Sequence, residues 1–173
     1  MTKFWFYILA LALVGCSATP SIQEYYVSKT EDPSFLVIDI PTSILDIDSN
    51  TLSQEEQEAL SSFQKLNVLM FRKTTANAEQ FPEELAIVRS IIDAKTFESL
   101  FVMSDRQYSG KLVLEGTVEH PDEIVFFGAA DDGFVLARLI GSDMQVDKAM
   151  LLANVVQRGN GLENAAKMIS DMF

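Results

Sequence analysis

The chain has 173 residues, of which 13 are Lys or Arg and 25 are Asp or Glu, for a formal net charge of −12 at pH 7. Such an acidic chain is repelled by phosphate, which argues against nucleic acid as a partner and against flat adsorption on an anionic lipid surface. With one cysteine and one histidine, neither an intramolecular disulfide nor a zinc or redox site is expected. We expect no cofactor.

The N-terminus has the pattern of an export signal. One basic residue, Lys3, precedes an apolar run over residues 4–14, which is too short to span a bilayer as a permanent helix. The run ends in Leu13-Val14-Gly15-Cys16, which resembles the bacterial lipobox. The resemblance implies cleavage before Cys16 and attachment of a lipid to its thiol. A secretory signal cut elsewhere and an uncleaved anchor are the alternatives.

The residue after the cysteine bears on location. Ser17, rather than Asp, stands at this position and resembles a sorting signal for the outer membrane. We therefore expect a lipid-anchored protein of the cell envelope, on the outer membrane and facing the periplasm. The expected divisions are a signal peptide over 1–15, the lipidated cysteine with a short tether over 16–21, and a single domain over 22–173.

Helices and strands alternate in the first half of this domain. Ser53, followed three residues later by Glu56, is typical of a capping box and marks the start of a helix. The apolar run over 35–40 is rich in Val and Ile and indicates a buried strand. The expected elements are a helix over 22–29, a strand over 35–40, a short helix over 42–47, a helix over 53–63 and a strand over 66–71.

The second half contains the longest expected helix, which begins at Phe81 with Pro82 in its first turn. Apolar residues at helical spacing continue past residue 95, so we expect the helix to extend, after a bend near Lys95-Thr96, through Met103. The other expected elements are strands over 111–119, 124–127 and 134–140, with turns at His120-Pro121-Asp122 and Asp132-Gly133, a helix over 144–157 capped by Asp143, and a weaker helix over 162–173.

This order predicts an α+β fold with a largely antiparallel sheet of about five strands and helices packed on a face. The aromatic residues of the strand over 124–127 alternate, with Val125 and Phe127 on one side and Phe126 on the other. We expect them mainly in the core, and the alternative is an apolar patch offered to a partner or to lipid.

Four stretches carry a resemblance to a known family: the lipobox, residues 35–41, residues 66–71 and the hairpin with Asp131-Asp132-Gly133-Phe134. Together they are similar to small bacterial lipoproteins of domain-of-unknown-function family 4252. The resemblance covers nearly the whole mature chain and implies an envelope location and one α+β domain. That family has no assigned activity, so the resemblance implies no catalytic residues.

One loop has the spacing of a calcium site. Asp46, Asp48 and Asn50 match the first three ligands of an EF-hand, and Glu56 is placed to supply the closing carboxylate. The loop is one residue short and lacks the glycine of the sharp turn, and Glu56 already has a role in the capping box. We favour a capped turn over a cation site.

No catalytic motif is found. The single histidine, His120, falls in a turn beside Pro121 and Asp122, where solvent is the usual neighbour, so a catalytic role is not expected. The expected function is a non-enzymatic, membrane-anchored module for binding, sensing or structure, with an unidentified envelope protein as partner. Two alternatives stay open: a carrier of a lipid or apolar ligand, and a hydrolase of envelope polymers that uses carboxylates.

Overall fold

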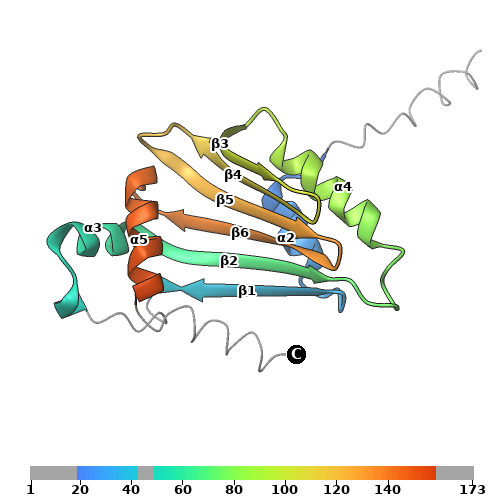
Figure 1. Ribbon diagram of the computed structural model, residues 1–173. Coiled ribbons are helices and arrows are strands. Elements are labelled where there is room, and N and C mark those ends of the chain that lie inside the picture. The colour runs from blue at the N-terminus through green and yellow to red at the C-terminus, as the bar shows by residue number, and fades with distance from the viewer. Residues whose placement is uncertain (1–18, 43–48, 159–173) are drawn as a thin grey trace, which may run out of the picture.

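A computed structural model of the protein describes residues 19–42 and 49–158. Within these ranges six strands form one antiparallel sheet in the order β1-β2-β6-β5-β4-β3 (Figure 1). The strands are β1 (Phe35–Pro41), β2 (Phe63–Arg72), β3 (Phe97–Ser104), β4 (Tyr108–Gly116), β5 (Pro121–Ala130) and β6 (Gly133–Gly141). The α+β class and the antiparallel sheet are confirmed, with six strands in place of about five.

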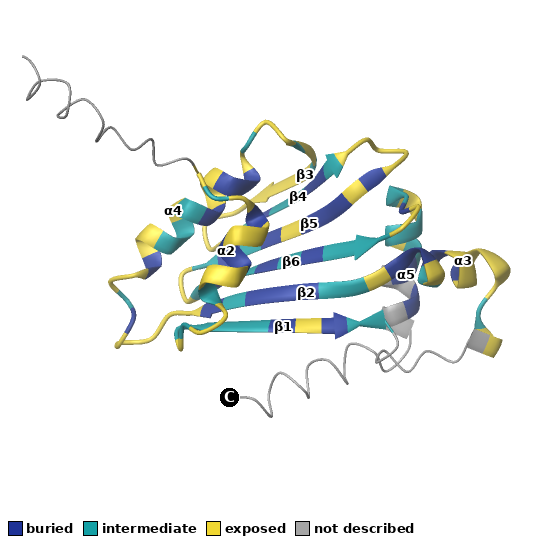
Figure 2. Ribbon diagram, turned by 180° about the vertical axis from the view of Figure 1, so that it is seen from behind, coloured by how far each residue is buried: buried dark blue, intermediate teal, exposed yellow. Residues whose placement is uncertain are grey.

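Four α-helices and one 3-10 helix accompany the sheet in the described ranges. They are α2 (Ile22–Lys29), η3 (Ser49–Thr51), α3 (Gln54–Ser62), α4 (Phe81–Ile92) and α5 (Val146–Arg158). Figure 2 shows α2 and α4 side by side over one face of the sheet, whereas α3 and α5 lie at one end of it. The helices therefore do not all share one face. No helix in the described part of the chain is long and apolar enough to cross a membrane.

The main core lies between the sheet and the pair α2 and α4. Val88, Ile91 and Ile92 recur at helical spacing in α4 and are all buried, as the periodicity predicts. Tyr25 and Tyr26 form the buried side of α2. The sheet contributes buried side chains from alternate positions of its strands: Leu69, Phe71, Val113, Val125, Phe127, Phe134 and Leu136.

A cluster of aromatic rings closes one end of this core. The rings of Phe71 and Phe134 stack with centroids 5.5 Å apart and planes 9° from parallel. Phe35 meets both rings edge-on, and Phe81 packs against them from the start of α4. Pairs of this kind add to the stability that area burial alone provides.

The opposite face is less evenly covered. Leu152 of α5 packs with Phe63 and Met144 at the end where α3 and α5 lie. Toward the other end Phe126 is 44% exposed, although its neighbours Val125 and Phe127 are buried on the first face. The alternation expected for this strand is confirmed, and one of its two faces carries an exposed aromatic ring.

Residues 97–104 correct the sequence prediction. They form the edge strand β3 rather than a continuation of α4, which ends at Ile92. The register pairs Phe97 with Glu115 and Ser104 with Ser109. β3 and β4 therefore form a hairpin, and β3 satisfies the backbone hydrogen-bonding groups along one edge of β4. The apolar residues of this segment fit both the helical period of 3.6 and the strand period of 2. Pairing with β4 therefore decides that the segment forms a strand.

Several boundaries also differ from expectation, and β5 begins at Pro121, within the turn expected at His120-Pro121-Asp122. β4 ends at Gly116, whose φ of 97° suits glycine, and an added Cβ there would lie 2.8 Å from the His120 carbonyl oxygen. The β5–β6 hairpin turns at Asp131-Asp132, one residue earlier than Asp132-Gly133. Asp143 does not cap α5, because it has a φ of 54° and the helix begins at Val146.

Other expectations hold within the described ranges. The helix over 22–29 has the expected bounds, and Ser53 and Glu56 form the expected capping box. Residues 43–48, where most of the short helix over 42–47 is expected, lie outside the described residues. The same is true of the helix expected over 162–173.

Candidate functional site

A row of polar side chains crosses the helix-bearing face beside α2. Because β1, β2, β6, β5 and β4 are neighbours, their register brings together positions from distant parts of the chain: Asp39 pairs with Asn67, Asn67 with Arg138, and Glu123 with Glu115. The row, called the polar row below, consists of Asp39, Asn67, Arg138, Glu123 and Glu115. Its centre is unusual because Asn67, Glu123 and Arg138 are all buried.

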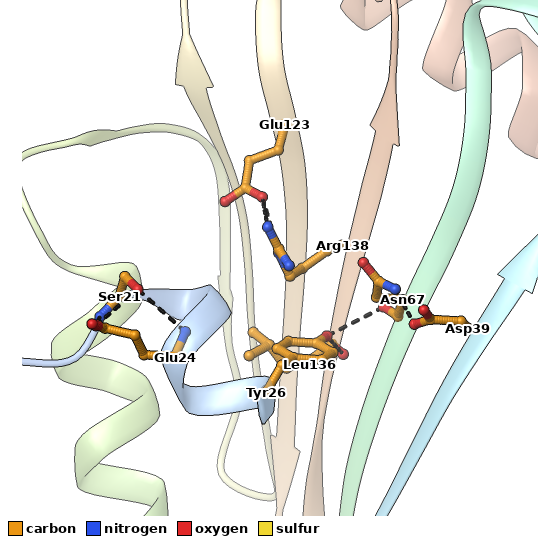
Figure 3. Close-up of polar contacts among 8 residues, drawn as sticks. All are labelled: Ser21, Glu24, Tyr26, Asp39, Asn67, Glu123, Leu136 and Arg138. Carbon is orange, nitrogen blue, oxygen red and sulfur yellow. Dashed lines mark hydrogen bonds and ion pairs between the residues drawn. The ribbon is translucent and has the colours of Figure 1, made fainter. Parts of the chain in front are cut away.

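Glu123 and Arg138 form an ion pair at the centre of the row (Figure 3). Arg138 donates from Nε to the Oε2 atom of Glu123 at 2.9 Å and donates from Nη2 to the same oxygen. Each side chain is only 6% exposed. The second oxygen of Glu123, Oε1, is buried and has no hydrogen-bond partner among the described residues.

Burial raises the pKa of Glu123 above its ordinary value, since a carboxylate loses hydration on leaving water. Arg138 opposes this rise through its charge and its hydrogen bonds, whereas Glu115 and Asp122 add to the rise. The side chain therefore holds its proton more tightly than a carboxyl group in solution does.

Tyr26 covers the ion pair from α2. Its hydroxyl donates to the carbonyl oxygens of Leu136, at 2.5 Å, and Asn67, at 3.2 Å. The guanidinium carbon of Arg138 lies 5.4 Å from the centre of the tyrosine ring, which is within cation–π range. Burial raises the pKa of the Tyr26 hydroxyl, so it remains a donor at neutral pH.

Local capping holds α2 in this position. Ser21 accepts a hydrogen bond from the amide of Glu24 at 3.2 Å, and the Glu24 carboxylate accepts one from the amide of Ser21 at 2.7 Å. The bond from that backbone amide lowers the pKa of Glu24. From the same helix, Tyr25 donates to the carboxylate of Glu84 in α4 at 2.8 Å. The helix that carries Tyr26 is thus fixed at its N-terminus and along its side.

The β1 end of the row is open to solvent. Asn67 donates from its side-chain amide to Asp39, and the ammonium of Lys65 lies 3.7 Å from the same carboxylate. These side chains line a recess of about 540 Å³ beside α2, together with Tyr26 and Arg138. The recess brings both signs of charge together, which suits a small ligand that carries polar or charged groups.

A second recess, of about 470 Å³, lies on the opposite face. Its lining is mostly apolar and includes Met70, Met103, Tyr108, Phe126 and Val135. Gly110 and Gly128 are paired across β4 and β5, so neither contributes a side chain there. An apolar surface of this kind suits a hydrocarbon chain or an apolar side chain of a partner.

The residues singled out in the sequence do not form a site in the described part of the chain. Cys16, Asp46 and Asp48 lie outside the described residues. Asn50 lies in η3, and Glu56 accepts a hydrogen bond from the amide of Ser53 at 2.9 Å. Within residues 19–42 and 49–158 no three His, Cys, Asp or Glu side chains are close enough together to hold a metal ion.

His120 lies in the turn between β4 and β5 and is exposed. Its amide donates to the hydroxyl of Thr117 at 3.1 Å, and its carbonyl oxygen accepts from the amide of that residue. These backbone contacts of His120 are those of a turn residue.

Two carboxylates, Glu115 and Glu123, are neighbours across β4 and β5. However, one oxygen of Glu123 is bound by Arg138, and its other oxygen is shielded from solvent.

Sequence reasoning missed the central ion pair, although a signal was present. Arg138 stands in the apolar run of β6, at an alternate position after the buried Phe134 and Leu136, so it lies on the same face of the strand as they do. Glu123 precedes Val125 and Phe127 in the same way. A charged residue at an inward position of a strand predicts a buried partner of opposite charge, because an unpaired charge is too costly there.

Comparison with known proteins gives a family and no activity. No curated protein matches the chain, and no solved structure matches it. The family model described as a domain of unknown function, DUF4252, matches residues 25–152, which extend from α2 into α5 and take in the whole sheet. The chain therefore belongs to the DUF4252 family.

Proposed function

We propose that the protein is a non-enzymatic lipoprotein of the bacterial envelope, anchored through Cys16, whose α+β domain binds a partner at the membrane surface. The observation that carries the proposal is the position of the lone cysteine. It ends a lipobox-like motif and stands three residues before Thr19, where the described fold begins. Ser17 supports the outer membrane, facing the periplasm.

The described contacts support a compact domain at the end of a short tether. Thr19 shares a hydrogen bond of 3.0 Å with Ser90 of α4, so the chain is held against the domain from that residue onward. Membership of DUF4252 adds no catalytic residue to this picture. The partner class that we propose is an envelope protein, and the acidic charge of −12 argues against nucleic acid.

The anchor is tested by expressing the full chain and the Cys16→Ala variant in a bacterial host. We expect the unaltered chain in the membrane fraction, with lipid on its N-terminal peptide by mass spectrometry, and the variant released. An unmodified N-terminal peptide would contradict the proposal. Crosslinking in intact cells, followed by mass spectrometry of the captured proteins, then tests the partner, with the variant as the control for membrane placement.

A second candidate, a carrier of an apolar ligand, is favoured by the recess lined by Met70, Phe126 and Val135. The two proposals differ in what copurifies with the protein. Lipid extraction of protein purified from membranes, followed by mass spectrometry, would reveal a bound apolar molecule in stoichiometric amount. Substitution of Gly128 by Leu, which would fill the floor of the recess, should remove that molecule and leave the anchor lipid in place.

A further inference from the structure

The outer strand β3 exposes apolar side chains on both of its faces. Phe101, Val102 and Met103 are consecutive and are 57%, 63% and 47% exposed, and Tyr108 at the start of β4 is 56% exposed. β3 pairs only with β4 and forms one edge of the sheet. A hydrophobic edge strand is an interaction surface unless something covers it. These four residues are called the apolar edge below.

The chain enters the domain beside the start of β3, the strand that carries most of the apolar edge. Thr19 lines a recess together with Phe97, the first residue of β3, and Glu115 of β4. Figures 1 and 2 both place β3 along the edge of the sheet nearest to α4, with β1 along the opposite edge. Three Cα–Cα steps separate Cys16 from Thr19, and they span about 11 Å at most. A lipid on Cys16 would therefore hold this side of the domain close to the bilayer.

Local charge permits that approach. The segment over 95–115 carries three basic residues, Lys95, Arg106 and Lys111, and three acidic residues, Glu98, Asp105 and Glu115, so its net charge is 3 − 3 = 0. The full excess of −12 is carried by the rest of the chain. An anionic bilayer repels the far side of the domain more than it repels this hairpin, which favours the same orientation as the tether.

From these three observations we propose that the apolar edge docks on the interface of the membrane that carries the lipid anchor. Phe101, Val102, Met103 and Tyr108 contact the boundary between headgroups and acyl chains, where aromatic and aliphatic side chains are stable. The occupant of this surface is the bilayer. The inference rests on the proposed anchor at Cys16 and adds the orientation in which the domain is held.

Thiol accessibility tests the docking in the full chain. Lipid attached to Cys16 blocks the only native thiol, so a single added cysteine reports on its own surroundings. Val102→Cys places the probe at the apolar edge. Val27→Cys is the matched control, because Val27 is 76% exposed and lines the recess that includes Val37 and Asp39 of β1. A membrane-impermeant maleimide labels each variant in opened native membranes, in detergent, and in vesicles of phosphatidylethanolamine and phosphatidylglycerol that contain the purified protein.

We expect Val102→Cys to react about tenfold more slowly in membranes and vesicles than in detergent, a ratio that corresponds to about 1.4 kcal/mol. Val27→Cys should react at similar rates in all three. Equal rates for the two variants in membranes would overturn the docking and leave the anchor intact. If Val102→Cys is protected in native membranes but not in vesicles of lipid and purified protein, a protein partner covers the apolar edge and the docking on the bilayer is overturned. If Val102→Cys remains protected in detergent, self-association covers the apolar edge and the docking is likewise overturned.

The chain without an added cysteine separates the two proposals. It should not react with the maleimide and should remain in the membrane fraction. Labelling of Cys16 in that chain would overturn the anchor, and the docking with it. No labelling of Cys16, combined with full labelling of Val102→Cys in membranes, would overturn the docking alone.

Discussion

Arg138 directs two hydrogen bonds to one oxygen of Glu123 and leaves the other oxygen of that carboxylate buried without a partner. The pair joins β5 to β6 under the ring of Tyr26, at the centre of the polar row. A buried pair with one unsatisfied oxygen is a poor source of stability, since desolvation of both charges offsets their attraction. Its main effect on folding is to penalise any arrangement in which one charge is buried alone.

Removal of Arg138 from this pair should be strongly destabilising. We expect Arg138→Met to lower the free energy of unfolding by about 3–5 kcal/mol, because it leaves a buried carboxyl group without its counterion. The double substitution Glu123→Met with Arg138→Met should recover most of that loss. Urea unfolding curves of the two variants provide the measurement.

The control is Lys65→Ala, which removes the solvent-exposed ion pair with Asp39 at the open end of the row. This pair has side chains 44% and 61% exposed and should contribute less than about 1 kcal/mol. Equal losses for Lys65→Ala and Arg138→Met would contradict the special position of the buried pair.

The raised pKa of Glu123 predicts a particular dependence of stability on pH. Above pH 4.5, the ordinary value, the unfolded chain loses this proton while the folded chain retains it up to its raised pKa. The folded state then binds more protons than the unfolded state, so this contribution to stability is complete below pH 4.5 and falls as pH rises through the window. The difference in unfolding free energy between the unaltered chain and Glu123→Gln should therefore shrink from pH 4.5 upward. A difference that stays constant or grows with pH would show that the pKa is not raised.

The sequence predicts the elements of this fold best where periodicity and capping agree. Ser53 with Glu56 marks the start of α3, and Val88 with Ile91 defines the buried side of α4. β3 could not be predicted in this way, because a segment with apolar residues at mixed spacing becomes a strand only when β4 lies beside it.

The polar row illustrates a different limit. Its members Asp39, Asn67 and Arg138 are far apart in the chain. They become neighbours only through the strand order β1-β2-β6-β5, in which β6 lies between β2 and β5. Local propensity contains no information on that order. The charged residue at an inward strand position predicts that a partner exists, and the topology of the sheet decides which residue it is.

Gly133 should tolerate no side chain. A Cβ at this position would lie 2.2 Å from the carbonyl oxygen of Phe71 in the neighbouring strand β2, so the two backbones would have to separate. We expect Gly133→Ala to lower the free energy of unfolding by about 1–3 kcal/mol, as overpacking does elsewhere. Thermal or urea unfolding would measure this loss.

Gly110→Ala is the matched control in the same sheet. A Cβ at Gly110 would meet Met103 at 3.5 Å and the carbonyl oxygen of Phe127 at 3.6 Å, which are ordinary contact distances. Its unfolding free energy should stay near that of the unaltered chain. Similar losses for both alanine variants would mean that close approach of β2 is not the reason for glycine at Gly133.

The capping box at the start of α3 predicts the effect of a small substitution. Ser53 accepts a hydrogen bond from the amide of Glu56 at 3.2 Å, and Ser53→Ala leaves that amide without its cap. We expect a loss of about 1 kcal/mol in the free energy of unfolding. Ser61→Ala, in the last turn of the same helix, is the control, since its hydroxyl only donates to the carbonyl oxygen of Glu58.

The same region decides between a capped turn and a calcium loop. Glu56 already accepts a hydrogen bond from the amide of Ser53 at 2.9 Å, and a closing calcium ligand would have to leave that position. We therefore expect millimolar calcium to leave the melting temperature nearly unchanged, since a bound ion would stabilise the folded state in proportion to the logarithm of its concentration over the dissociation constant. Melts with calcium and with a chelator, repeated on Asp48→Ala, measure this. A calcium-dependent rise that disappears in Asp48→Ala would establish a cation site in the loop before α3.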